Sequence, residues 1–182
     1  MSKILLDACV LYPTVMRAAL IGAARAGLYT PLWSERILEE WARAAARLGP
    51  VGEMIARGEV TVLKAEFPRS CIAEAKGLER RLYLPDANDI HVFAAAIAGH
   101  GDAIVTMNRK DFPGNILAEE GLDRFDPDNF LRAFCTTHPK IMNDIAAEIT
   151  TEARRLSGTD IETRKLFKKA RLPRFGKAVE QV

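Results

Sequence analysis

The stretch from Asp86 to Phe112 places the strongest limits on how this chain folds. Its sequence is D-A-N-D-I-H-V-F-A-A-A-I-A-G-H-G-D-A-I-V-T-M-N-R-K-D-F. After Asp89 the residues are mostly apolar and predict a buried helix, and a glycine-containing turn then leads into a short predicted strand at residues 103–106. Polar residues follow this strand directly. Because chemistry in α/β proteins is carried out at the carboxyl ends of parallel strands, the sequence predicts a functional site here.

A second strand end of the same kind lies near the start of the chain. The apolar run Ile4–Leu6 stops at Asp7, which is typical of a buried parallel strand that leaves the sheet at a polar residue. Two interpretations of Asp7 are open: it is a site carboxylate, or it caps the turn that follows. Asp86 and Asp89 have a similar alternative, since carboxylates are favoured at the N-terminus of a helix. Asp89 fits that alternative less well, because it borders the apolar face of its helix.

A further acidic candidate lies on a helix predicted over residues 35–47. Ser34 is a favourable N-cap for this helix, and the apolar residues behind it recur at helical spacing. Glu39 stands four residues before Arg43, so the two are expected to pair on the surface. Glu40 borders the apolar face instead, which makes it the glutamate of this helix best placed to point into a site.

The rest of the chain supplies further elements around an α/β body. The β-branched run Val60–Leu63 predicts a strand, and residues 67–82 predict a polar helix. After Asp128 the pattern becomes helical, with helices expected over residues 129–135, 139–156 and 163–172. We therefore predict two domains, an α/β body over residues 1–128 and an α-helical appendage over residues 129–182.

Charge is distributed unevenly along the 182 residues. The net charge is +2, yet residues 151–182 carry a net +5 and the preceding residues carry −3. Such asymmetry indicates an anionic partner, although a solvated charged tail explains it equally well. The three cysteines form no C-x-x-C pair, so neither a disulfide framework nor a zinc site is expected, and a reducing cytoplasm fits best. No segment is apolar over the ~20 residues that span a membrane, and the apolar run near Met1 is too short for a signal peptide.

Several other chemistries of α/β proteins are excluded because their motifs are missing. The chain contains no G-x-G-x-x-G, no G-x-x-x-x-G-K-[ST] and no G-x-S-x-G. Carboxylates from a strand end and from helix faces, joined by an amide oxygen, would instead form a cluster of oxygen ligands. Such a cluster suits Mg²⁺ or Mn²⁺ rather than zinc, and phosphodiester hydrolysis is the chemistry that it performs best.

Four motifs, taken in their order along the chain, resemble those of a known protein family. They are Asp7 at the end of the first strand, S-x-x-I-L-x-E at Ser34–Glu40, D-x-x-D-x-x-x-x-A-A-A at Asp86–Ala96, and V-T-x-N-x-x-D-F at Val105–Phe112. In this order and spacing the chain resembles PIN-domain ribonucleases, in particular VapC-like toxins of type II toxin–antitoxin pairs. The resemblance covers residues 3–130. It implies a PIN-like parallel sheet flanked by helices, a Mg²⁺ or Mn²⁺ site, and single-stranded or loop RNA as the substrate.

The resemblance also implies roles for individual residues. Asp7, Glu40 and Asp89 match the acidic metal ligands, and Asn108 stands in the fourth position, where many relatives have Asp. This difference lowers the charge of the site by one. It leaves open a PIN-fold module that binds RNA or a partner without cleaving. Supporting roles are expected for Asp86, Thr106 and Asp111.

The same resemblance predicts the partners of the protein. An RNA substrate, a cognate antitoxin and a second copy of the chain in a homodimer are expected, in the cytoplasm and without a membrane. The helical segment after residue 128 resembles the extension of some bacterial toxins of this family. Its basic residues are expected to contact RNA or a partner: Lys165, Lys168, Lys169, Arg171 and Arg174.

Overall fold

The computed structural model describes residues 1–179 of the chain, which divide into two compact units. The first unit contains Met1–Tyr12 and Tyr29–Phe125, and the second contains Pro13–Leu28 and the described residues from Asp126 onward. The first unit holds the whole sheet and all the acidic site residues predicted from the sequence. The second unit holds the predicted basic contacts.

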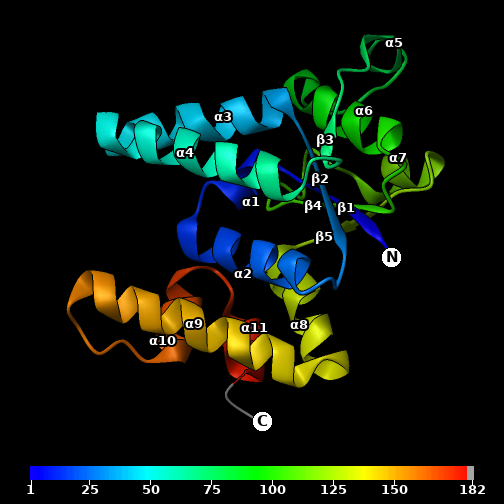
Figure 1. Cartoon of the computed structure of the whole chain (residues 1–182). Coiled ribbons are helices and arrows are strands. Elements are labelled where there is room, and N and C mark those ends of the chain that lie inside the picture. The colour runs from blue at the N-terminus through cyan, green and yellow to red at the C-terminus, as the bar shows by residue number, and fades with distance from the viewer. Residues whose placement is uncertain (180–182) are drawn as a thin grey trace. The chain divides into compact units, whose positions relative to one another are not determined.

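Five short strands form the sheet of the first unit: β1 (Lys3–Leu6), β2 (Thr30–Ser34), β3 (Cys71–Ile72), β4 (Ala103–Val105) and β5 (Asp123–Phe125). Their order is β3-β2-β1-β4-β5, and every neighbouring pair is parallel (Figure 1). The central strand is β1, whose Ile4, Leu5 and Leu6 are all buried. A strand covered on both faces requires such a continuous apolar run. The structure thus confirms the predicted α/β class with a parallel sheet.

Helices flank this sheet where the sequence supplies caps and apolar faces. Helix α3 (Glu35–Ala45) begins after Ser34, whose Oγ accepts a hydrogen bond from the Ile37 N–H at 3.3 Å, as predicted for an N-cap. Helix α6 (Ile90–Ala98) packs against β1, β2 and β4, and it is buried over most of its length. The unit also contains α1 (Ala8–Leu11), η1 (Ala46–Leu48), α4 (Pro50–Glu66), α5 (Lys76–Glu79), η2 (Ala87–Asp89) and α7 (Gly114–Glu119).

The strand predicted at Val60–Leu63 is wrong, because these residues lie in the last turns of α4. Their β-branched side chains favour a strand locally, but this preference is weak compared with tertiary packing. Helix α4 runs beside α3 (Figure 1), and Ala56 and Leu63, seven residues apart on one helical face, are both buried. The other face of α4 leaves four apolar side chains exposed: Val51, Met54, Ile55 and Val62.

The polar helix predicted at residues 67–82 is also mostly absent. The segment instead contains β3 and the short helix α5, joined by irregular chain. Ser70 accepts a backbone hydrogen bond from the Trp33 N–H at 3.0 Å, and β3 continues this pairing with β2. Pairing with a neighbouring strand therefore replaces the helix that the local sequence favours.

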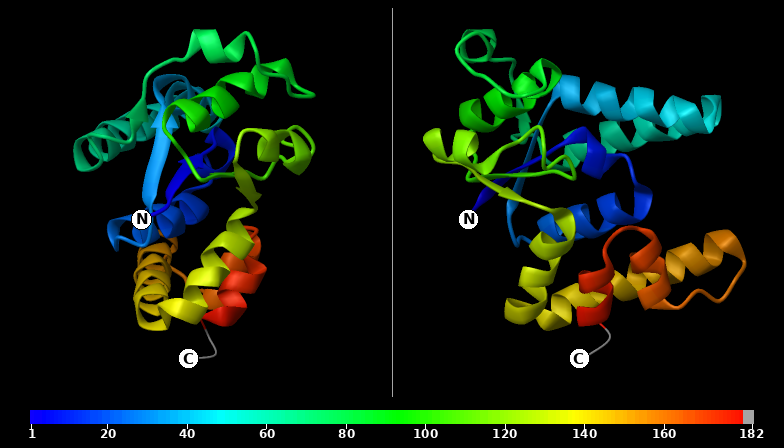
Figure 2. Two further views of the ribbon diagram at one scale, coloured as in Figure 1. Left: turned by 90° about the vertical axis from the view of Figure 1, so that its right-hand side faces the viewer. Right: turned by 180° about the vertical axis from the view of Figure 1, so that it is seen from behind.

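The second unit is helical in its described residues. It contains α2 (Thr14–Arg25), α8 (Pro127–Thr137), α9 (Pro139–Ser157), α10 (Thr163–Lys169) and α11 (Pro173–Ala178), so the helices predicted after Asp128 are present. The two views of Figure 2 show the last four helices packed against one another. Helix α2 joins α8 and α9, and Gly22 lies so close to Ile145 that a Cβ there would come 2.9 Å from Cγ2. Within residues 1–179, no helix combines the length and the apolar character that a bilayer crossing requires.

Candidate metal centre

The candidate site lies at the topological switch point of the sheet, where the strand order reverses. From β1 the chain adds β2 and β3 on one side, and it then crosses back to add β4 and β5 on the other. Open α/β sheets bind ligands at such a switch point, outside the carboxyl ends of the strands. Asp7 follows β1 and Thr106 follows β4, and the pairing of Leu6 with Val105 brings these two residues together.

The carboxylate of Asp7 is buried and points into this switch point. Its backbone N–H donates to the Val105 carbonyl at 3.2 Å, and its side chain makes no capping hydrogen bond to α1, which excludes the capping interpretation. Instead Oδ2 accepts hydrogen bonds from the Thr106 hydroxyl at 2.7 Å and from the Cys9 thiol at 3.1 Å. Burial and the neighbouring Asp7 charge raise the pKa of Cys9 to about 12, so this cysteine stays a thiol and a donor.

A chain of hydrogen bonds connects Asp7 to Asp89 through residues that follow β4. The Thr106 Oγ1 that donates to Asp7 accepts the Asn108 backbone N–H at 3.0 Å. The Asn108 side-chain amide in turn donates to Asp89 Oδ2 at 3.2 Å. Three of the four residues predicted as metal ligands, Asp7, Asp89 and Asn108, are therefore connected within one network.

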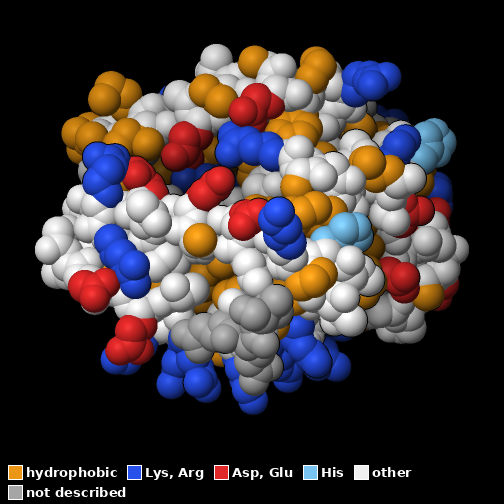
Figure 3. Space-filling view, turned by 60° about the horizontal axis from the view of Figure 1, so that its bottom comes forward, with side chains coloured by type: hydrophobic (Ala, Val, Ile, Leu, Met, Phe, Trp, Pro, Cys, Tyr) orange, Lys and Arg blue, Asp and Glu red, His pale blue; other side chains and the backbone are white. Residues whose placement is uncertain are grey.

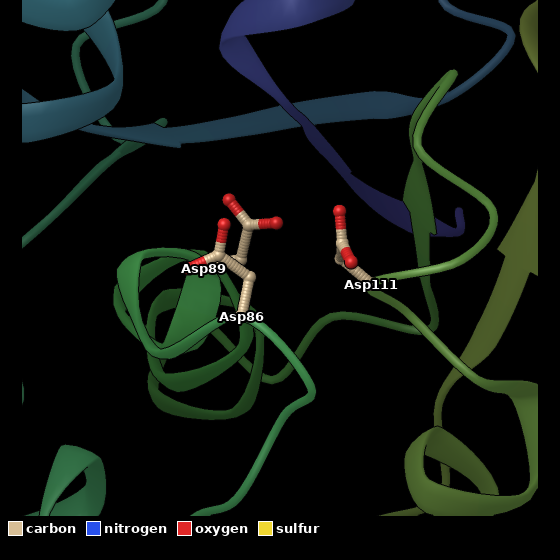
Figure 4. A group of neighbouring side chains, drawn as sticks. All are labelled: Asp86, Asp89 and Asp111. Atoms are coloured by element: carbon tan, nitrogen blue, oxygen red, sulfur yellow. The ribbon is translucent and has the colours of Figure 1, made fainter.

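Asp86, Asp89 and Asp111 form a group of carboxylates. One oxygen from each lies within 4.8 Å of the others, and Figure 4 shows Asp111 facing the two aspartates of the η2–α6 segment from the opposite loop. Asp86 also caps η2 by accepting the Asn88 backbone N–H at 2.9 Å, so its capping role is real. Asp89 makes no capping hydrogen bond.

This group fits a divalent cation bound by oxygen. In an octahedral Mg²⁺ site two opposite oxygens are about 4.2 Å apart, since each metal–oxygen distance is ~2.1 Å. The ligand oxygens of the three carboxylates all lie within 4.8 Å of one another, so only small shifts would be needed to reach one ion. Carboxylates are the ligands that Mg²⁺ and Mn²⁺ prefer, and the group offers neither thiolate nor imidazole. The residues present could therefore hold a divalent metal ion.

Electrostatic repulsion within the group is visible at Asp89. Partial burial raises the pKa of Asp89 to about 6, and the negative charges of Asp7, Asp86 and Asp111 contribute to the same shift. Asp7 is thus close enough to act on Asp89, although it lies outside the group of three. A bound cation would remove the repulsion that holds this carboxyl partly protonated.

Glu40 is not a member of this group and has partners of its own. Its Oε1 is 3.1 Å from His91 Nε2 and accepts a hydrogen bond from Arg36 Nε at 3.1 Å. Burial alone would raise the pKa of Glu40, but the His91 and Arg36 contacts outweigh it and the pKa is lowered. Glu39 instead pairs with Arg43 at 2.7 Å and with Arg57 at 2.9 Å, which confirms the predicted surface role.

Two of the predicted site residues thus have different neighbours from those expected. Asp111, expected only in a supporting role, lies opposite Asp89, while Glu40 is held by His91 rather than by the other acids. The contact of His91 with Glu40 was not predicted from the sequence. His91 is two residues from Asp89 and therefore faces another side of the helix, and only the packing of α6 near α3 brings it to Glu40.

The fold and the site together define an α/β protein with a group of carboxylates at its switch point that could hold a metal ion. A family model described as "PIN domain" matches residues 3–110, so the chain belongs to the PIN-domain family. PIN domains are generally nucleases, and they typically use a divalent metal. Comparison with curated proteins and with solved structures gave no match.

The raised pKa of Asp89 predicts how the stability of the metal-free protein depends on pH. The folded protein holds a proton on Asp89 up to about pH 6, whereas the unfolded chain releases it near pH 4, so the free energy of unfolding falls as the pH rises through this window. Asp89→Asn, which cannot ionise, is expected to raise the melting temperature in EDTA by a few degrees at about pH 7.5, and by much less at about pH 4.5. Differential scanning fluorimetry at both pH values measures this, and an equal shift at both would contradict it.

Proposed function

We propose that this chain is a divalent-metal-dependent endoribonuclease and the toxin of a toxin–antitoxin pair. The observation that carries the proposal is the meeting of Asp86, Asp89 and Asp111 at the switch point of a PIN-domain sheet. The assignment to RNA and to a toxin is supported by the order and spacing of the four sequence motifs. A cognate antitoxin and a homodimer belong to the same proposal.

The residues of the chain take distinct parts in this proposal. Asp86, Asp89 and Asp111 would hold the metal ion, and Asp7 adds negative charge beside them. Thr106 fixes the carboxylate of Asp7, and Asn108 fixes that of Asp89. A bound Mg²⁺ or Mn²⁺ would supply neutralisation of phosphate charge and activation of water for in-line attack. Carboxylates held by hydrogen bonds need little rearrangement to receive the ion and the phosphate.

The proposal gives Glu40 a role separate from that of the three aspartates. Its oxygen is held from two sides, by His91 on α6 and by Arg36 on α3, and Arg36 also donates to the Asn88 carbonyl at 3.4 Å. These contacts fix Glu40 to the segment that carries Asp86 and Asp89. We expect Glu40 to act as a further acidic ligand or to orient a bound water.

The experiment that tests the proposal is cleavage of a structured RNA by the purified protein with Mg²⁺, with Mn²⁺ and with EDTA. Glu40→Gln is expected to lower the cleavage rate by at least about 100-fold, because it removes the charge but can still accept the hydrogen bond from Arg36. Glu39→Gln is the matched control, since Glu39 is occupied by Arg43 and Arg57 on the surface, and it should stay within about twofold of wild type.

Two outcomes would count against the proposal. Equal losses in Glu40→Gln and Glu39→Gln would mean that the helix face assigned to Glu40 is wrong. Binding of RNA without cleavage in either metal would favour a non-catalytic module, and Asn108→Asp is then the informative change. It restores the fourth carboxylate, so a gain of cleavage would identify the site as one weakened by asparagine.

A further inference from the structure

The surface of α10 and α11 is unusually basic for a nearly neutral protein. Between Thr163 and Val179 the chain contains seven Lys or Arg residues and no Asp or Glu. All seven are exposed, and among the other residues of this segment only Pro173 is. We call this the α10–α11 basic surface; it consists of Arg164, Lys165, Lys168, Lys169, Arg171, Arg174 and Lys177. Lys and Arg side chains gather along the lower edge of Figure 3.

The basic surface rests on a rigid apolar support. Leu166, Phe167, Leu172 and Phe175 of the same segment are buried, and the rings of Phe167 and Phe175 meet edge to face with centroids 4.9 Å apart. Gly176 lies so close to Phe167 that a Cβ there would come 2.8 Å from the Phe167 Cβ. The charges are therefore presented by two helices packed together, and not by a solvated tail.

Carboxylates outside this segment contact it: Glu162 pairs with Lys165 at 2.8 Å, and Asp128 is occupied by backbone groups. Asp128 is buried, and its oxygens accept the backbone N–H groups of Arg174 at 3.0 Å and of Phe175 at 2.8 Å. These amides belong to the first turn of α11, which has no intrahelical acceptor for them. The Arg174 guanidinium meets the neutral Asn129 amide oxygen at 2.7 Å, so its charge is retained.

Four cations of the surface have no partner among residues 1–179: Lys168, Lys169, Arg171 and Lys177. Arg171 also adopts a left-handed backbone, with a φ of 62°, at the end of α10. Its N–H donates to the Lys168 carbonyl and the Leu172 N–H to the Phe167 carbonyl, which is a helix-terminating motif that usually has glycine at this position. A left-handed backbone is unfavourable for arginine, so this position carries a charge at the expense of stability.

The composition of the surface distinguishes between classes of partner. Protein interfaces have an apolar or aromatic centre surrounded by a polar rim. In Thr163–Val179 the leucines and phenylalanines are buried, and the exposed residues other than Pro173 are cations, so this segment has no such centre. Four cations without a described partner, in a segment that itself contains no carboxylate, match a phosphodiester backbone, where binding is driven by neutralising phosphates and releasing their counterions.

We propose that the α10–α11 basic surface binds the phosphodiester backbone of single-stranded nucleic acid. The proposal rests on the proposed nuclease function for its substrate, RNA, but the binding itself requires neither metal nor cleavage. The surface would add affinity that is independent of sequence, since phosphate contacts carry no base information. RNA and DNA share this chemistry, and the test separates them.

The test measures binding of the full chain in EDTA, so that no cleavage occurs. Fluorescence anisotropy is recorded with labelled single-stranded RNA, and with DNA of the same sequence, over a series of KCl concentrations. The variant changes Lys168, Lys169 and Lys177 to Ser and Arg171 to Gly. The control changes four other exposed cations to Ser, namely Arg47, Arg69, Arg80 and Lys140.

The variant is expected to bind RNA at least about tenfold more weakly at moderate salt, and the slope of log K against log [KCl] should fall by up to about 3, since each single-strand phosphate contact contributes ~0.7. The control should stay within about twofold in affinity. Arg171→Gly alone should weaken binding without lowering the melting temperature, because glycine suits the left-handed backbone. This single variant keeps the test informative if the fourfold variant is unstable.

Three results would overturn the inference. The first is an affinity and salt slope in the variant equal to those of the control. The second is a tenfold or larger preference between RNA and DNA, which would show that the backbone phosphates are not the main ligand. The third is equal displacement of RNA by polyglutamate and by unlabelled RNA, which would assign the surface to acidic peptides. Binding through this surface without cleavage in any metal would instead contradict only the proposed nuclease function.

Discussion

Asp89→Asn is expected to abolish metal-dependent cleavage of RNA, with a loss of at least about 100-fold in rate. Asp89 is the carboxylate on which the other acids of the centre act: its pKa is raised by partial burial and by the charges of Asp7, Asp86 and Asp111. An amide in its place retains the shape of the side chain but ligates Mg²⁺ far more weakly than a carboxylate does. Cleavage of a labelled RNA in Mg²⁺ and in Mn²⁺ measures the effect.

The control for this variant is Asp144→Asn, which changes an exposed aspartate of α9 in the second unit. It should cleave at the wild-type rate. Because Asp89→Asn is also expected to raise the melting temperature of the metal-free protein at neutral pH, loss of cleavage through unfolding can be separated from loss of a ligand. Full activity in a folded Asp89→Asn protein would remove Asp89 from the proposed centre.

Asp128→Ala is expected to lower the free energy of unfolding of the second unit by about 3 kcal/mol. Asp128 is 7% exposed and accepts the two backbone N–H groups at the start of α11. Alanine would leave the buried Phe175 N–H and the partly buried Arg174 N–H without an acceptor, and an unsatisfied buried donor costs about 1–3 kcal/mol. Urea denaturation followed by circular dichroism, together with amide hydrogen exchange in α11, measures the loss.

Asp126→Ala is the matched change two residues away. Asp126 caps α8 by accepting the Asn129 N–H at 2.9 Å, but it is exposed, so water can replace it. Removing an exposed cap costs about 1 kcal/mol. A larger loss in Asp126→Ala than in Asp128→Ala would mean that the α8–α11 connection does not depend on the buried carboxylate.

The parts of the fold that were predictable are those encoded within a few residues. Ile4–Leu6 followed by Asp7 identified the central strand and its polar end, and Ser34 identified the start of α3. The same local reasoning failed at Val60–Leu63 and at residues 67–82. In both places the local preference was weak, and packing against α3 or pairing with β2 decided the conformation.

The candidate site likewise has parts that local sequence patterns predict and parts that they do not. That acidic residues follow β1 and begin the segment before α6 was predictable, because these positions depend on local strand and helix patterns. Three contacts were not predictable in this way: Asp111 faces Asp89, His91 holds Glu40, and Asp128 caps a helix more than forty residues further along the chain. Such contacts depend on the order of strands in the sheet and on how helices pack over it. Periodicity and capping signals carry no information about either, because they describe neighbours along the chain and not neighbours in space.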